Sequence, residues 1–236
     1  MNTPDEYYTK KLYPLQDGIL KIISDTNTPF YLTGGTALSR CYFHHRYSED
    51  LDFFVNSDDN YEQHVRAIIH NLEKHQSDHS FTVDKAATVA EKNFTQIIIV
   101  RHGLEEKCVL KIDLINDVAE KFGKLVVDEQ FGRIDNVLNI LSNKLTALYR
   151  LEPKDIADIW IISKNVHFNW QRIANDAKEK EMGLDVLKMS ELIKTFPVEF
   201  IDKIKWSISF QPELFIDELS IIAEDLFWGK ENRLYP

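Results

Sequence analysis

Apolar residues along the first half of the chain follow two different periods. Helical spacing, as at Ile68, Ile69 and Leu72, alternates with short runs rich in β-branched and aromatic residues, which are typical of strands. The predicted helices are residues 5–25, 36–44 and 61–74, and the predicted strands are residues 29–32, 51–55, 81–84, 94–100 and 108–115. Pro14 is expected to break or restart the first helix, because proline cannot continue the helical hydrogen-bond ladder.

From about residue 135 onward the pattern is helical almost throughout. Asp135 is suited to cap the first helix of this half, and Pro153 suits the first turn of the next. Further helices are predicted over residues 170–181, 185–194, 198–206 and 212–228. We therefore expect an α/β (α+β) domain with a mixed sheet over residues 1–130, followed by an all-helical C-terminal domain over residues 131–236.

The composition is that of a folded globular protein, with 44% hydrophobic and 28% charged residues in a chain of 236. A net charge of −10 argues against a surface built for indiscriminate nucleic-acid binding, although a local basic groove stays possible. Cys41 and Cys108 show no metal or redox spacing and are expected to be reduced. Because the sequence has no signal pattern and no bilayer-spanning apolar run, we expect a cytoplasmic protein with no membrane partner.

Asp50 and Asp52 stand two residues apart at the start of the predicted strand 51–55. Residues two apart in a strand point to one face, so these carboxylates project together while Leu51 and Phe53 point into a core. Two adjacent carboxylates repel each other unless a cation lies between them. Mg²⁺ prefers oxygen ligands and commonly keeps substrate phosphates in its shell. The pair is therefore suited to hold Mg²⁺ and a nucleoside triphosphate together.

A Gly-Gly-Thr turn formed by Gly34, Gly35 and Thr36 precedes this pair. Glycines let the backbone approach an anion closely, and the following helix offers phosphate its N–H groups and the positive end of its dipole. A third carboxylate is expected in a phosphoryl-transfer site. In the last predicted strand, Asp113 shares with Lys111 the face opposite the buried side chains. If that strand neighbours the one with the aspartate pair, Asp113 can reach the metal and activate an attacking hydroxyl.

Each of these features also has a purely structural interpretation. An Asp-x-Asp can be a surface feature in a chain with 38 acidic residues, and a Gly-Gly pair is usually a simple turn. Lys111 and Asp113 can form the solvated face of an edge strand. The order of the elements favours function, because a strand, Gly-Gly-Thr, a helix and then a strand opening with Asp-x-Asp form a specific arrangement.

The segment from Gly34 to Phe53 resembles the AbiEii/AbiGii-type toxins, a branch of the polymerase-β-like nucleotidyltransferase superfamily. In that family a Gly-Gly-Thr-Ala-Leu helix start is followed by an Arg-x-Ser-x-Asp-Leu-Asp-Phe strand. The matching residues are Gly34, Gly35, Thr36, Ala37 and Leu38, then Arg46, Ser48, Asp50, Leu51, Asp52 and Phe53. The resemblance implies a nucleotidyltransferase domain in which Asp50, Asp52 and Asp113 are catalytic and bind two Mg²⁺ ions.

Later motifs extend the resemblance over roughly residues 30–165. A Lys-x-Asp strand is matched by Lys111 and Asp113, and two helical motifs, Lys-x-x-Ala-Leu and Lys/Arg-Asp-x-x-Asp, follow after the strands. The helical matches are Lys144, Ala147, Leu148, Arg150, Lys154, Asp155 and Asp158. Together with Gly34, Gly35 and Thr36, the nucleotide-binding residues that the resemblance implies are Arg46, Ser48, Lys144 and Asp158.

These further positions have structural alternatives as well. Lys144 can extend along the apolar stripe of its helix to reach solvent. Asp155 and Asp158 can be capping and surface charges near a helix start. Arg46 can form an ion pair with Glu49 or Asp50, and Ser48 can simply shape the turn.

The function implied is transfer of a nucleoside monophosphate from a nucleoside triphosphate to an acceptor hydroxyl. By resemblance, the acceptor is RNA, such as a tRNA 3′ end, and the chain is the toxin of a toxin–antitoxin pair with a cognate antitoxin as partner. Two alternatives stay open: an aminoglycoside-like small-molecule nucleotidyltransferase, and a non-catalytic nucleotide-binding module.

Overall fold

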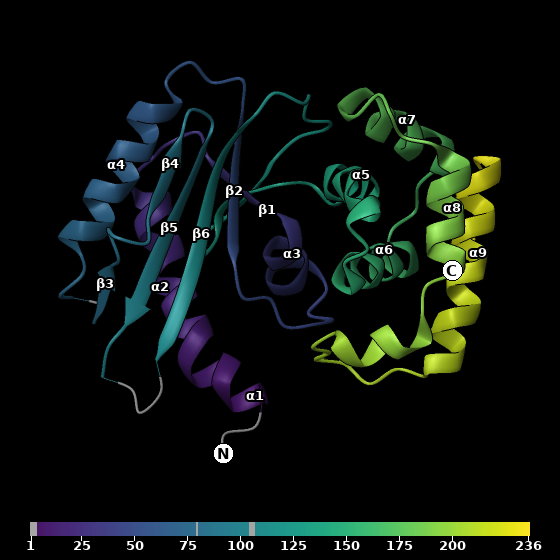
Figure 1. Cartoon of the computed structure of the whole chain (residues 1–236), viewed down its shortest axis with the longest axis horizontal. Coiled ribbons are helices and arrows are strands. Elements are labelled where there is room, and N and C mark those ends of the chain that lie inside the picture. The colour runs from purple at the N-terminus through teal and green to yellow at the C-terminus, as the bar shows by residue number, and fades with distance from the viewer. Residues whose placement is uncertain (1–3, 79, 104–106) are drawn as a thin grey trace. The chain divides into compact units, whose positions relative to one another are not determined.

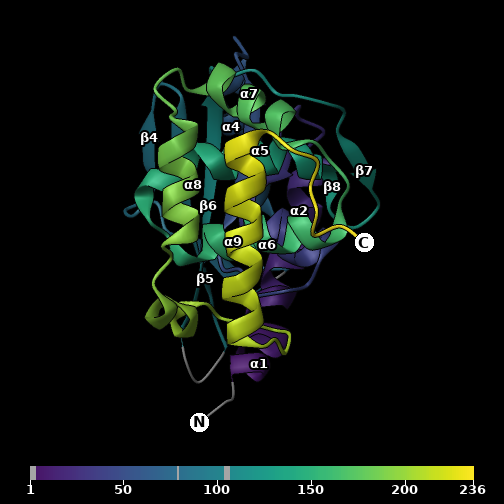
Figure 2. The same ribbon diagram turned by 90° about the vertical axis from the view of Figure 1, so that its right-hand side faces the viewer.

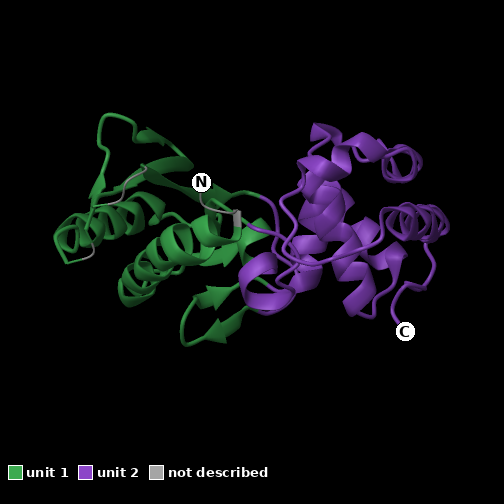
Figure 3. Ribbon diagram, turned by 90° about the horizontal axis from the view of Figure 1, so that it is seen from below, with its two compact units in different colours: residues 1–37, 48–118, 125–135 green, residues 38–47, 119–124, 136–236 purple. Residues whose placement is uncertain are grey.

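The computed structural model describes residues 4–78, 80–103 and 107–236, and these residues form two compact units that interleave along the chain. Unit 1 comprises residues 1–37, 48–118 and 125–135, and unit 2 comprises residues 38–47, 119–124 and 136–236 (Figure 3). The predicted division into domains of residues 1–130 and 131–236 stays a prediction. None of the described helices is long and apolar enough to cross a membrane.

Unit 1 is built on an eight-stranded mixed sheet, as expected, with strand order β3-β5-β6-β2-β1-β8-β7 and β4 paired to β5. The strands are β1 (Tyr31–Thr33), β2 (Leu51–Asn56), β3 (Phe81–Val83), β4 (Val89–Glu91), β5 (Phe94–Arg101), β6 (Cys108–Asp117), β7 (Val126–Asp128) and β8 (Gly132–Ile134). β2 runs parallel to β6 and antiparallel to β1, while β1 and β8 are parallel. The strands that carry Asp52 and Asp113 are therefore neighbours, which is the condition for Asp113 to lie near the aspartate pair.

Two long helices, α2 (Tyr13–Asp25) and α4 (Tyr61–Lys74), pack against each other and cover one face of this sheet (Figure 1). Alternation in β2 buries Leu51, Phe53 and Val55 on that face and turns Asp52 to the other. Ahead of α2 lie α1 (Pro4–Tyr7) and a π-helical turn, η1 (Tyr8–Leu12). Pro14 lies in the first turn of α2, so the helix restarts there as predicted.

The sequence pattern missed three short strands, β4, β7 and β8. β4 is exposed along its whole length, and β7 is exposed at Val126 and Val127. A strand whose residues stay in solvent shows no apolar alternation, so only pairing with a neighbour defines it.

After β8 the described elements are helices, and they belong to unit 2. They are α5 (Val137–Ala147), η3 (Leu148–Arg150), α6 (Pro153–Asn165), α7 (Trp170–Lys180), α8 (Val186–Lys194), η4 (Val198–Lys203) and α9 (Pro212–Trp228). α8 and α9 run side by side (Figure 2). Trp160 packs edge-on against Trp206 and Phe215, which builds part of the apolar core of this unit.

The prediction that Asp135 caps the first of these helices is wrong. Asn136 caps α5, since its side chain accepts a 3.0 Å hydrogen bond from the Asn139 N–H. Asp135 continues the sheet instead: its N–H donates to the Leu32 carbonyl, and its carboxylate accepts from the Thr33 hydroxyl at 2.7 Å. Both residues are good capping types, and the extension of the β8 ladder decides between them.

Candidate functional site

A row of four polar residues crosses the sheet of unit 1 at one level. Thr33 on β1 pairs in register with Asp52 on β2, Asp52 pairs with Asp113 on β6, and Asp113 pairs with Gln96 on β5. Side chains of register partners lie on the same face of a sheet, so the two carboxylates and the Gln96 amide lie together on the face that α2 and α4 do not cover. The alternation along each strand determines the face of the sheet to which a side chain points. The pairing of the strands determines which side chains lie next to it.

Asp113 is buried and held on both of its oxygens. Gln96 Nε2 donates to Oδ1 at 3.0 Å, and Lys111 Nζ lies 3.1 Å from Oδ2. The same ammonium lies 3.4 Å from Asp50 Oδ2, so Lys111 bridges two of the three predicted catalytic carboxylates. Burial lowers the pKa of Lys111, but the hydrogen bond to Asp113 and the charges of Asp50, Asp113 and Asp52 outweigh it, and the net shift is upward. Lys111 is therefore a firmly charged member of the site.

The turn after β1 brings backbone against this carboxylate row. Gly34 has φ +66°, a left-handed conformation that suits glycine, and a Cβ added there would lie 2.8 Å from Asp52 Oδ2. Gly34 also opens α3 (Gly34–Thr36), which passes directly into a π-helical turn, η2 (Ala37–Tyr42). The Gly-Gly-Thr sequence thus places a tight turn directly beside the Asp52 carboxylate.

Thr36 and Ser48 are buried and joined to each other. Thr36 Oγ1 lies 2.9 Å from Ser48 Oγ and also hydrogen bonds to the backbone carbonyl of Asp50. From the other side, the buried Gln16 on α2 donates to the carbonyls of Ser48 at 3.2 Å and Glu49 at 3.0 Å. These bonds fix the backbone that leads into β2, and with it the position of Asp50.

The donor chemistry of this cluster fits a hard divalent cation. Asp50, Asp52 and Asp113 supply carboxylate oxygens, the ligands that Mg²⁺ prefers. In the described part of the chain, no three His, Cys, Asp or Glu side chains are already arranged around a common metal position. The Lys111 ammonium interacts electrostatically with all three carboxylates. The oxygen ligands for a metal are therefore present in the site, but their side chains do not converge on one metal position.

Unit 2 contains a separate group of buried charges, which we call the Asp158 cluster: Asp158, Arg46, Lys144, Asp155 and His45. Arg46 donates to Asp158 from Nε at 2.7 Å and from Nη2 at 2.8 Å. Lys144 Nζ lies 2.6 Å from both Asp155 and Asp158. His45 Nε2 lies 2.8 Å from Asp158 Oδ1. All five residues are buried, so the alternatives of a Lys144 that reaches solvent and of surface charges at Asp155 and Asp158 are wrong.

The cluster balances its own charge. Burial by itself raises the pKa of Asp158, but Arg46, Lys144 and the bond from His45 outweigh it and hold the pKa well below its usual range. Burial also lowers the pKa of Lys144, and the charges of Asp158 and Asp155 reverse that shift. Burial lowers the pKa of His45 despite its contact with Asp158, so this imidazole is neutral near pH 7. Two carboxylates and two cations therefore face each other in a low-dielectric interior.

The predicted site residues thus fall into two groups. Unit 1 brings together the three aspartates with Gly34, Thr36 and Ser48, while Arg46, Lys144 and Asp158 meet inside unit 2. Gln96, Gln16 and His45 were not predicted as site residues. The sequence provides little indication of a role for the two glutamines. A polar residue between buried ones is common, and the residues that each glutamine contacts are distant in the sequence.

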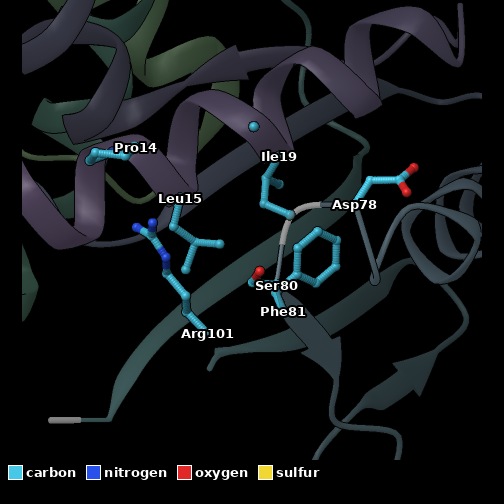
Figure 4. A pocket seen from close by; sticks show the side chains of 8 residues that line it. Pro14, Leu15, Ile19, Asp78, Ser80, Phe81 and Arg101 are labelled. Carbon is cyan, nitrogen blue, oxygen red and sulfur yellow. The ribbon is translucent and has the colours of Figure 1, made fainter. Parts of the chain in front are cut away.

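A cavity of about 270 Å³ lies elsewhere in unit 1, lined by Leu15 and Ile19 of α2 and by Phe81 and Arg101 of paired strands (Figure 4). Arg101 is five residues beyond Gln96 on β5, so its side chain takes the opposite face of the sheet. The cavity therefore lies on the helix-covered face and is not part of the carboxylate row.

Comparison with known proteins agrees with the geometry. Residues 19–205 match the family described as nucleotidyl transferase AbiEii toxin of a type IV toxin–antitoxin system. No curated protein matches the chain. The fold is similar to that of JHP933 from Helicobacter pylori, with a TM-score of 0.56, 20% identity and 92% of each chain covered. It is also similar to a candidate nucleotidyltransferase from H. pylori, with a TM-score of 0.57, 20% identity and coverage of 93% of this chain and 95% of that one. The chain therefore belongs to the AbiEii toxin family and is a nucleotidyltransferase.

Proposed function

We propose that this protein transfers a nucleoside monophosphate from a nucleoside triphosphate to a hydroxyl group of RNA, with Mg²⁺ as cofactor. The observation that carries the proposal is the register of Asp52 with Asp113 on adjacent parallel strands, beside the turn at Gly34. This arrangement concentrates negative charge and oxygen ligands on one sheet face, where a divalent metal ion would supply positive charge to both the carboxylates and the triphosphate.

In the proposed reaction, the acceptor oxygen attacks the α-phosphorus and forms a new phosphorus–oxygen bond. The bond between the α-phosphorus and the oxygen that bridges to the β-phosphate breaks, and pyrophosphate leaves. Asp50, Asp52 and Asp113 hold Mg²⁺, which when bound supplies Lewis-acid stabilisation of the phosphate charge. Asp113 accepts the proton of the attacking hydroxyl, and the hydrogen bond from Gln96 holds its carboxylate in position. Thr36 and Ser48 keep Asp50 in place through their mutual contact and the carbonyl bond.

The nucleotide-binding roles of the remaining predicted residues are also part of the proposal. Gly34, Gly35 and Thr36 present backbone N–H groups to the outer phosphates. Arg46, Lys144 and Asp158 contribute to nucleotide binding as the family motifs imply. Asp158 holds both cations, Arg46 through two hydrogen bonds and Lys144 at 2.6 Å. We further propose that residues 131–236 form the helical C-terminal domain, that the protein acts in the cytoplasm, and that a cognate antitoxin opposes it.

A label-transfer experiment tests the reaction. Purified protein is incubated with Mg²⁺, total RNA and each nucleoside triphosphate in turn, labelled either at the α- or at the γ-phosphate. We expect label in RNA from one or more α-labelled nucleotides and none from γ-labelled ones, because pyrophosphate is the leaving group. Oxidising the terminal ribose of the RNA with periodate beforehand tests whether the acceptor is a 3′ hydroxyl.

Two matched variants connect that activity to the site. Asp52→Asn keeps the shape of the side chain but removes its charge, and should lower transfer by at least about a hundredfold. Asp59→Asn makes the same change at an exposed position and should leave transfer intact. Transfer to an aminoglycoside but not to RNA would overturn the acceptor assignment, and nucleotide binding without any transfer would overturn the proposed reaction.

A further inference from the structure

Lys111 places an ammonium group between two of the three carboxylates of this site. It lies on β6 two residues before Asp113, so both side chains share the face opposite the buried Leu110 and Ile112. Its ammonium lies 3.1 Å from Asp113 and 3.4 Å from Asp50. β6 is paired on both sides, to β5 and to β2, so the backbone of Lys111 is fixed and only its four-carbon side chain can move.

The oxygens that Lys111 contacts are the ones that a divalent cation needs. A metal ion bound to Asp50 and Asp113 would lie within a few ångströms of the present ammonium position, where two cations repel each other strongly. The lysine side chain is flexible and about a third exposed, at 34%, so a path away from the carboxylates is open to it. Binding of metal and retention of this ion pair are therefore mutually exclusive.

We propose that Lys111 is a built-in counter-cation: its ammonium stabilises the carboxylates until a divalent cation displaces it, and this competition sets the metal affinity. The inference rests on the proposed function of Asp50, Asp52 and Asp113 as metal ligands. In the metal-free protein the bridge relieves the repulsion between the carboxylates, so the sheet can pair Asp52 with Asp113 at little cost. The consequence is a site that binds metal more weakly than its three carboxylates alone would.

The first test measures Mn²⁺ binding without nucleotide, by the electron paramagnetic resonance signal of the free ion. Lys111→Met keeps an unbranched side chain of nearly the same length and removes its charge. This variant should bind Mn²⁺ about tenfold or more tightly than the unmodified protein. Lys92→Met removes the same charge from an exposed residue in the turn between β4 and β5, and should bind as the unmodified protein does.

The second test uses the unmodified protein, so it does not depend on the folding of any variant. Lysines are labelled with an amine-reactive reagent, with and without saturating Mg²⁺, and the extent of labelling at each lysine is read by mass spectrometry. Metal binding should raise the labelling of Lys111 severalfold, because the displaced amine leaves its carboxylate partners. The labelling of Lys92 should not change.

Asp52→Asn separates this inference from the proposed function. If Mn²⁺ binds equally well to that variant and to the unmodified protein, the assignment of the metal site itself fails. If binding depends on Asp52 but Lys111→Met binds Mn²⁺ no more tightly, or Mg²⁺ leaves Lys111 labelling unchanged, the counter-cation inference is overturned and the metal site stands. Tighter binding by Lys111→Met together with metal-dependent labelling supports it.

Discussion

Asp158 on α6 accepts two hydrogen bonds from the guanidinium of Arg46, one from Nε at 2.7 Å and one from Nη2 at 2.8 Å. This two-bond geometry fixes direction as well as distance, which a lysine at position 46 could not do. Arg46 belongs to residues 38–47, the segment of unit 2 that joins the Gly-Gly-Thr turn to the aspartate pair along the chain. The Asp158 cluster therefore anchors the connection between two of the site's sequence motifs.

Removing the carboxylate at the centre of this cluster should be costly. Asp158→Ala leaves the Arg46 guanidinium buried without its main anion, and we expect the free energy of unfolding to fall by about 3–5 kcal/mol. Asp25→Ala breaks the exposed pair with Lys21 on α2 and should cost no more than about 1 kcal/mol. Urea denaturation of both variants gives the two values, and a similar small loss in both would contradict the anchoring role.

His45 should make stability depend on pH in a defined direction. Burial lowers its pKa in the folded protein below the ordinary value of 6.5, although the contact with Asp158 opposes this. Below about pH 6.5 the unfolded chain is protonated at His45 while the folded protein keeps this imidazole neutral. The contribution of His45 to the free energy of unfolding is therefore complete above about pH 6.5 and declines as the pH falls below that value. The decline can reach about 1.4 kcal/mol per pH unit.

Two histidine variants isolate that contribution. The free energy of unfolding is measured by urea denaturation between about pH 5 and 7.5. His45→Gln should flatten the pH dependence, and His70→Gln, which changes an exposed histidine on α4, should leave it unchanged. Equal slopes in all three proteins would show that His45 titrates no differently in the folded and unfolded states.

Gly34 should tolerate no side chain. Alanine there must adopt a left-handed backbone at a cost of about 1–2 kcal/mol, and its Cβ must displace the Asp52 carboxylate. A shift of about 1 Å in a catalytic group can lower a reaction rate about a hundredfold. We therefore expect Gly34→Ala to lower the rate of nucleotidyl transfer by about a hundredfold. Gly183→Ala, where the added Cβ meets no atom within 4 Å, is the matched control and should retain transfer. Full activity in Gly34→Ala would show that this contact does not position Asp52.

The Thr36 hydroxyl should matter for stability before any nucleotide binds. Thr36→Val keeps the shape but leaves the buried Ser48 hydroxyl and the Asp50 carbonyl without this partner, which should cost about 1–3 kcal/mol in urea denaturation. Thr36→Ser retains the hydroxyl and should lose much less. If the two variants are equally stable, the hydroxyl is not what fixes the backbone before β2.

Most secondary structure could be predicted from the local pattern, because periodicity is a property of consecutive residues. α4 was predicted to the residue, and the strands bearing Asp52 and Asp113 were predicted within two residues of their ends. Short exposed strands such as β7 escaped, since their existence depends on a partner and not on their own composition. Asn136 rather than Asp135 caps α5 for the same reason, a contact with a distant segment. The side chain of Asp135 accepts a hydrogen bond from Thr33 in the sheet, and the side chain of Asn136 accepts one from the Asn139 N–H.

The sequence by itself determined which face of a strand each aspartate takes, the Gly-Gly-Thr turn before them, and the family to which the chain belongs. Only the tertiary structure decided that Asp113 stands beside Asp52, that Gln96 and Lys111 hold it, and that Arg46, Lys144 and His45 gather on Asp158. The physical reason is that side-chain direction follows from the local backbone. The partner of a charged group depends instead on which distant segments pack together and exclude water, where each buried charge requires an opposite one.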